Sequence, residues 1–311
     1  MPSVLLEFTF YLALLAAAIR IAAPLLFAAL GETIAEWAGV VNIGLEGTML
    51  MGAWAAFMGT YYSGSGLVGV GAGMAAGALL TAILGYVCIS RGANQVIAGI
   101  VINIFAAGTT SLIFRQTFRL TLPNVSSFAP VPIPLLSDLP VLGLVFFRHT
   151  LLVYAAFLVV PVCAFVIYRT HFGLCLRAAG EHPAAVDAAG INVLGIRYAA
   201  ILLCGALAGL GGAALSIGQL NQFTDNLTSG RGFIALAIVL LGRWNPVKVM
   251  FGTLLFAGAD ALQLRLQVIG FAVPKEVLGM IPYLLAIFAM AFFVGRLHMP
   301  AAMAKPYLRE S

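Results

Sequence analysis

A succession of long apolar stretches constrains the fold of this chain more than any other feature of its sequence. A helix needs roughly 20 mostly apolar residues to cross a hydrocarbon core about 30 Å thick. Eight stretches meet that need, at residues 10–30, 38–61, 67–89, 95–114, 150–168, 198–217, 247–266 and 277–294. A ninth, residues 233–241, is short and predicts either a tilted span extended by its flanks or a half-helix buried among others. We expect an all-α, polytopic membrane bundle of about 8–10 transmembrane helices.

The composition agrees with a membrane environment. Of the 311 residues, 62% are hydrophobic and only 9% are charged, whereas soluble domains carry about 25% charged residues. The 34 glycines are typical of transmembrane helices that pack closely together. No cluster of Lys and Arg alternates with aromatic residues, so nucleic acid is not expected as a partner. We therefore expect a single transmembrane domain over residues 1–311, surrounded by membrane lipid.

The titratable and sulfur-bearing residues do not suggest catalysis. The four cysteines have neither zinc-site nor disulfide-framework spacing; they are Cys88, Cys163, Cys175 and Cys204. The four histidines lack metal-binding spacing, and the phosphate-cradling pattern GxxxxGK[ST] does not occur. We expect no enzyme activity, no metal and no cofactor bound by this chain. Energy for any transport must then come from a partner or from an ion gradient.

The distribution of Lys and Arg indicates an orientation in the membrane. With an external N-terminus and nine crossings, nine of these residues fall on the inner side and six on the outer side. Residues 115–149 are then external, and their many prolines predict an irregular loop. Residues 169–197 are internal and polar, and their Ala-rich middle predicts a short helix with Pro183 in its first turn and Gly190 as its terminator.

Carboxylates near the second apolar stretch are candidates for function. Glu32, Glu36 and Glu46 lie in or against a span, where a carboxylate is costly and normally faces the bundle interior, a cavity or a partner charge. One hypothesis is that they line a conduit. The alternative is that Glu32 and Glu36 lie in an internal loop, while Glu46 pairs with Arg20 for structural reasons.

Polar residues elsewhere extend the set. Buried asparagines commonly hydrogen-bond between helices, and they can also recognise an uncharged polar solute. The tract 219–232 predicts either an ordinary external loop or a segment that directs a half-helix into the membrane. Asp260 lies within five residues of Arg265, which suggests a structural charge pair. The candidate residues of a translocation pathway are Asn42, Glu46, Asn94, Asn103 and Asn221.

Four segments resemble a known family, the permeases of bacterial ABC importers, which includes simple-sugar, nucleoside and branched-chain amino acid systems. They are AALGETIAEWAGVVNIGLEGTMLMGA, ANQVIAGIVIN, GLCLRAAGEHPAAVDAAGINV and SGRGFIALAIVLLGRWNP. The first is most similar to the nucleoside branch, and the resemblance covers roughly residues 24–295. It implies a fold like the type II importers and a place in the bacterial inner membrane.

The same resemblance implies partners and a coupling site. The partners would be a second permease subunit, cytoplasmic ATP-binding subunits that hold ATP and Mg, and an extracytoplasmic substrate-binding protein or lipoprotein. In that family an Arg-Ala-x-Gly-Glu-x-Pro-x-Ala-Ala pattern marks the internal loop that touches the ATPase. This chain differs in having His182 after the glutamate and Val186-Asp187 after the alanines. The implied ATPase-coupling residues are Arg177, Ala178, Gly180, Glu181, Pro183, Ala184, Ala185, Asp187 and Gly190.

Several functions stay open at this level. The first is an ABC permease for a nucleoside, with a simple sugar or a riboflavin-like vitamin as alternative cargo. The second is an ion-coupled secondary transporter that would use Glu32, Glu36, Glu46 or Asp260 as a cation site. A membrane enzyme or scaffold has little support, because no nucleophile, base and metal can be assembled.

Overall fold

Long helices account for most of the chain. The structure is a computed structural model, and it describes residues 8–119, 123–125, 128–134, 136–139, 141–269, 273–293 and 299–307. The longer helices are α2 (Phe8–Trp37), α3 (Leu45–Ser63), α4 (Gly66–Gly85), α5 (Gln95–Phe118), α7 (Leu151–Arg169), α8 (His171–Glu181), α10 (Val193–Leu215), α11 (Arg231–Gly242), α12 (Pro246–Val268) and α14 (Ile281–Phe293). Three short helices are α6 (Leu142–Phe146), α9 (Pro183–Ala188) and α13 (Lys275–Leu278), and π-helical turns η1 (Tyr86–Ser90) and η2 (Ser216–Leu220) extend α4 and α10.

Within the described residues, six helices are long and apolar enough to cross a membrane. They are α2, α4 with η1, α5, α7, α10 with η2, and α12. The all-α membrane bundle expected from the sequence is therefore confirmed. The short ninth stretch is α11, whose 12 residues span about 18 Å at 1.5 Å per residue, less than a bilayer core. Of the two readings of that stretch, the half-helix fits the structure.

Two predicted spans have the wrong bounds. Residues 38–44 are not helical, and α3 begins only at Leu45, because a buried turn separates it from α2. The predicted span 277–294 is divided into α13 and α14 by a turn at residues 279–280, and residue 294 lies outside the described residues. Pro282 explains this second break, since proline fits the first turn of a helix but not its interior.

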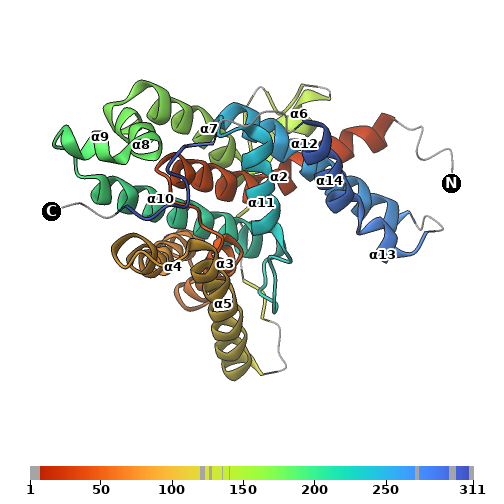
Figure 1. Cartoon of the computed structure of the whole chain (residues 1–311). Helices are drawn as coiled ribbons and strands as arrows, with labels where there is room; N and C mark the ends of the chain where they lie inside the picture. Colours follow the sequence, from red (N-terminus) through yellow and green to blue (C-terminus); the bar gives the residue numbers. More distant parts are fainter. Residues whose placement is uncertain are drawn as a thin grey trace.

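Close contacts between small residues hold the centre together. Figure 1 shows α10 between α2 and the α3–α4 pair. A Cβ atom at Gly52 of α3 would collide with Gly209 of α10. A Cβ atom at Gly77 of α4 would collide with Gly205, which also belongs to α10. The backbones therefore touch directly, as expected for transmembrane helices that associate through packing.

The helix α5 presents a different surface. It carries many exposed large apolar side chains, including Ile97, Val101, Ile104 and Phe105. An apolar face of this kind suits contact with lipid or with another membrane subunit.

The loop 115–149 is more ordered than predicted. α5 continues to Phe118, and within the described parts β1 (Pro130–Pro132) pairs antiparallel with β2 (Arg148–Thr150), with α6 between them. Prolines are compatible with such an edge strand because the missing amide hydrogens face away from the partner strand. The expectation of an irregular loop was wrong for these segments.

The C-terminal residues and helices α8 and α9 lie together at one end of the bundle. The C-terminal residues 299–307 pack on α8 and α9, where the amide of Ala302 donates to the carbonyl of Gly180 at 2.8 Å and the hydroxyl of Tyr307 donates to Asp187 at 3.0 Å. Figure 1 shows this group at the end of the bundle opposite the start of α2 and α6. The segment predicted to be internal and the basic tail therefore share one end.

Candidate functional site

The break before α3 is buried, and polar side chains of α2 and α5 hydrogen-bond to several of its backbone groups. The amide of Val41 donates to Gln95 at 2.8 Å, and the amide of Gly47 donates to the Oδ1 atom of Asn103 at 2.7 Å. The Nδ2 atom of Asn103 donates to the carbonyl of Ile43 at 3.0 Å. Non-helical backbone at membrane depth is tolerated where protein groups satisfy it, and this arrangement meets that condition.

Glu32 and Glu36 lie within α2 and not in an internal loop, so that alternative was wrong. Both side chains are buried. The carboxylate of Glu32 accepts from the amide of Asn42 at 2.8 Å and from the thiol of Cys204 at 3.3 Å, and Glu36 accepts from the indole of Trp244. Neither carboxylate contacts a cationic side chain of the described residues. These contacts join α2 to α10 and to the turn after α11.

Glu46, in the first turn of α3, closes the N-terminus of the half-helix α11. Its Oε1 atom accepts from the hydroxyl of Thr228 at 2.5 Å and from the amide of Gly230 at 2.7 Å, and its Oε2 atom accepts from the amide of Gly232 at 2.6 Å. A carboxylate is well placed there, because free amides and the helix dipole favour negative charge. The predicted pairing of Glu46 with Arg20 was wrong.

Glycine is required at two positions of this junction. Gly230 has φ +84°, a conformation that side-chain-bearing residues rarely adopt, and a Cβ at Gly232 would overlap the backbone of Glu46. The Ser-Gly-Arg-Gly sequence at the start of α11 therefore fixes both the turn and the close approach of α3. We call this region, formed by Glu46, Thr228, Gly230 and Gly232, the α3–α11 junction.

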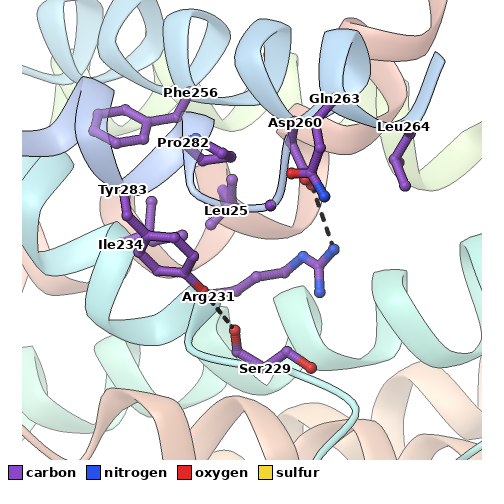
Figure 2. A pocket seen from close by; sticks show the side chains of 11 residues that line it. Leu25, Ser229, Arg231, Ile234, Phe256, Asp260, Gln263, Leu264, Pro282 and Tyr283 are labelled. Carbon is purple, nitrogen blue, oxygen red and sulfur yellow. Dashed lines mark hydrogen bonds and ion pairs between the residues drawn. The ribbon is translucent and has the colours of Figure 1, made fainter. Parts of the chain in front are cut away.

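A cavity of about 270 Å³ opens beside the junction, between α2, α11, α12 and α14. Figure 2 shows Arg231 reaching toward Asp260, at 3.4 Å, and Tyr283 donating from its hydroxyl to the carbonyl of Ser229, also at 3.4 Å. Gln263 adds an amide to the wall, and apolar residues complete it. The cavity thus combines an aromatic ring, a charge pair and an amide.

The predicted pairing of Asp260 with Arg265 was wrong, and helix geometry explains why. Residues five apart in a helix point about 140° away from each other, so Arg265 cannot face Asp260. The cation that does face it, Arg231, comes from a different helix. Sequence reasoning also missed Gln263 and Tyr283 as cavity residues, because nothing in a single apolar stretch indicates which face turns inward.

The five candidate pathway residues are only partly brought together. Asn42, Glu46 and Asn103 surround the start of α3, where Asn42 also donates from Nδ2 to Cys204 at 3.7 Å. Asn94 caps its own helix, accepting from the amides of Val96 and Ile97. Asn221 lies apart at the end of η2 and lines a different cavity. A contact of these residues with solute stays a prediction.

The Ala-rich segment forms two helices, α8 and α9. The predicted bounds of the short helix are confirmed, since Pro183 occupies the first position of α9 and Gly190, with φ +81°, follows its end. From the end of α8 through α9, the exposed side chains are small or polar; they are Glu181, His182, Ala184, Ala185, Ala188, Ala189 and Gly190. We call this set the α8–α9 surface.

The other coupling candidates lie behind that surface. Gly180 is buried, and a Cβ there would collide with the carbonyl of Trp37 at the end of α2. The guanidinium of Arg177 lies 5.6 Å from the ring centre of Tyr168 in α7. Ala178 and Asp187 are half-buried, and Asp187 is bonded to the C-terminal tail. These residues position α8 and α9 against the bundle.

Metal ligation has no candidate in the part of the chain that the structure describes. No group of three or more His, Cys, Asp or Glu side chains there could hold an ion. The arrangement instead offers a cavity, a half-helix and an exposed helical surface, which are features of a transport protein.

Comparison with known proteins agrees with this view. Residues 14–290 match the family described as "Branched-chain amino acid transport system / permease component". The "Putative glucose ABC transporter permease protein TsgC13" of Haloferax volcanii is 35% identical, over 97% of this chain and 99% of its own length. No solved structure matches the chain.

Two further relatives have nucleosides in their names. The guanosine ABC transporter permease protein NupQ of Bacillus subtilis is 37% identical over 93% of this chain and 94% of its own length. The nucleoside ABC transporter permease protein NupC of Lactococcus lactis is 33% identical over 92% and 94%. The chain therefore belongs to the permease component family of branched-chain amino acid transport systems, as a multi-pass inner-membrane subunit of an ABC transporter.

Proposed function

We propose that this chain is the membrane-spanning permease of an ATP-driven importer that carries a nucleoside. The observation that carries the proposal is the likeness, over more than nine-tenths of the chain, to two permeases named for guanosine and nucleoside transport. The permease itself makes and breaks no covalent bond. Its task is to present a solute site to one side of the membrane and then to the other.

The cavity beside α11 has the chemistry that a nucleoside needs. Aromatic rings offer stacking to the flat face of a base, and Tyr283 and Phe256 line the cavity. The amide of Gln263 and the Arg231–Asp260 pair can hydrogen-bond to base edges and ribose hydroxyls. We propose that the solute passes this cavity while the half-helix α11 shifts relative to α12 and α14.

The proposed drive for this shift comes from the α8–α9 surface. Small side chains allow a partner ATPase to fit closely against it. Gly180 touches Trp37, whose indole donates to the carbonyl of Trp244 at 2.9 Å just after α11. A continuous set of contacts thus leads from the surface to the half-helix, which is the kind of network that can carry coupling.

The assembly that we propose contains more than this chain. Two ATP-binding subunits would hold ATP and Mg and would dock at the end that carries α8, α9 and the C-terminal tail. A second permease subunit would complete the membrane part. An extracytoplasmic binding protein or lipoprotein would deliver the solute at the opposite end.

Uptake in cells tests the proposal. The chain is expressed with its ATPase and binding-protein partners in a bacterium that lacks nucleoside uptake, and entry of radiolabelled guanosine is measured. We expect uptake that Gln263→Ala reduces about tenfold or more, since the loss of one buried hydrogen bond to a solute costs that much. Gln267→Ala, one turn further along the same helix and outside the cavity, is the matched control and should keep normal uptake.

Competition decides between the cargo classes. Unlabelled nucleosides should abolish uptake, whereas glucose and riboflavin should not. Competition by glucose alone would favour the sugar alternative, which the likeness to the glucose-named relative supports. Loss of uptake on adding a protonophore, with ATP maintained, would instead favour an ion-coupled transporter and would overturn the proposal.

A further inference from the structure

Three arginines converge on one cleft that the transport proposal does not use. A cavity of about 250 Å³ near the start of α2 is lined by Arg20, Arg148, Arg265 and His149. A neighbouring cavity of about 430 Å³ shares Arg20, Arg148 and His149 and adds Asn221. Among the residues that the structure describes, no acidic side chain lines either cavity. We call the two together the arginine cleft.

The arginines come from three separate elements. Arg20 belongs to α2, and because helical side chains lean toward the N-terminus, it lies with Ala13 and Ala16 along the cleft. Arg148 is the first residue of β2, and Arg265 is in the last turn of α12. The Nε atom of Arg265 is buried without a hydrogen-bond acceptor among the described residues. The Nη2 atom of Arg148 already donates to the carbonyl of Ser137 at 3.1 Å. The cleft therefore offers positive charge with an unused donor on Arg265.

Two buried acceptors accompany this charge. His149 is 3% exposed, and its Nε2 atom lies 2.7 Å from the carbonyl of Val145. A carbonyl oxygen only accepts, so Nε2 carries the proton. Burial lowers the pKa of His149, the hydrogen bond to Val145 opposes this, and the charge of Arg20 lowers the pKa further. Both effects of the surroundings that lower the pKa favour the neutral ring, in which the buried Nδ1 atom is an acceptor. Within the described residues, neither Nδ1 nor the Oδ1 atom of Asn221 has a donor.

An apolar groove runs out of the cleft between α2 and α12. It has a volume of about 300 Å³, and its walls include Ala17, Ile21, Leu264 and Val268. Ala17, Ile21 and Leu264 also line the larger cavity of the cleft. The groove and the cleft are therefore continuous. A ligand that fills both must have a polar, anionic end and an apolar chain.

We propose that the arginine cleft binds an anionic phospholipid whose headgroup carries hydroxyls, of the phosphatidylglycerol class. The phosphate lies among the three guanidinium groups, which match phosphate oxygens with fixed donors. The headgroup hydroxyls donate to the Nδ1 atom of His149 and the Oδ1 atom of Asn221. The acyl chain lies in the groove between α2 and α12, where apolar contact adds to binding.

Lipid-dependent melting of the purified, delipidated full-length chain tests this site. The probes are phosphatidylglycerol, phosphatidylcholine and phosphatidic acid with the same acyl chains, and soluble glycerol phosphate. We expect phosphatidylglycerol to bind at least about tenfold more tightly than phosphatidylcholine. Both lipids carry the phosphate, but the quaternary ammonium of choline is repelled by the arginines and offers no hydroxyl to the acceptors of the cleft. Phosphatidic acid should lie between them, because it lacks the hydroxyls.

Substitutions separate the parts of the site. Arg20→Gln, at an exposed position, should remove most of the preference for phosphatidylglycerol over phosphatidylcholine, and Arg265→Gln should do the same. Arg119→Gln, an exposed arginine that lines neither cavity, is the control and should keep the preference. His149→Ala should bring phosphatidylglycerol down to the level of phosphatidic acid.

Three results would overturn the assignment. Equal binding of phosphatidylglycerol and phosphatidylcholine would show that the arginine cleft does not select lipids by the charge of the headgroup. A preference that survives in both Arg20→Gln and Arg265→Gln would place the lipid elsewhere. Equal binding of glycerol phosphate and the whole lipid would show a site for a soluble phosphate ester.

Discussion

The α3–α11 junction and the α8–α9 surface differ in how their residues are buried and hydrogen-bonded. At the junction, Glu46 is 8% exposed and takes three hydrogen bonds from the start of another helix. At the α8–α9 surface, Ala184 and Ala185 are exposed. Glu181 accepts one hydrogen bond, from the amide of Ala301 in the C-terminal tail at 3.3 Å. A buried polar group costs free energy when its partner is lost, whereas an exposed one turns to water. The junction should thus govern folding, and the surface should govern coupling.

The largest effect should come from Glu46→Ala. The substitution leaves two amides and a hydroxyl without an acceptor in a buried place, so we expect a loss of about 3–5 kcal/mol in the free energy of unfolding. Thermal melting of the detergent-solubilised chain measures it. Glu181→Ala is the control, because the same change on an exposed residue should cost less than about 0.5 kcal/mol. Similar losses in both variants would remove the distinction between the two regions.

A smaller effect is expected from Gly232→Ala. The added methyl group overlaps the backbone of Glu46, so α3 and α11 must separate, at a cost of about 1–3 kcal/mol. Gly258→Ala in α12 meets no atom within 4 Å, and there the better helix propensity of alanine should raise stability by up to about 1 kcal/mol. Unfolding in a denaturant series compares the two. A stabilised Gly232→Ala variant would contradict the close approach.

Two alanines of the same segment test the surface directly. Ala179 in α8 is fully buried and Ala185 in α9 is exposed. We expect Ala179→Leu to lower stability by about 1–3 kcal/mol through overpacking, and Ala185→Leu to change it by less than about 0.5 kcal/mol. Ala185→Leu should nevertheless lower uptake, because a larger side chain disturbs a partner that fits against the surface. Normal uptake in that variant would argue against the coupling role.

The sequence predicted those elements whose formation depends on residues that are close together in the chain. Length and apolarity were sufficient for the six spanning helices, because the bilayer sets both. Pro183 and Gly190 marked the ends of α9 through their backbone preferences. The short stretch 233–241 left a tilted span and a half-helix both open, and only the 12 residues of α11 in the structure favour the half-helix.

Partners in space could not be predicted in the same way. Glu46 bonds to residues more than 180 positions away, and Asp260 meets Arg231 and not its neighbour Arg265. An apolar helix with little amphipathic pattern does not reveal which face turns inward. The break at residues 38–44 was hidden for a related reason, since its buried Val40 and Val41 continue an apolar run.

The smallest effect on stability is expected for the ion pair of Asp225 and Arg115, which is exposed and lies outside both regions. Its charged groups are 2.6 Å apart. The hydroxyl of Ser111, and also Arg115, lower the pKa of Asp225. A carboxyl group with a lowered pKa contributes stability that is present above its unfolded pKa, about 4, and is lost as the pH falls through its folded value. Asp225→Asn should thus cost less than about 1 kcal/mol at pH 7. That cost should shrink in high salt and below pH 4, which melting curves at several pH values would reveal; a cost unchanged by both would mean that the charge of Asp225 plays no part.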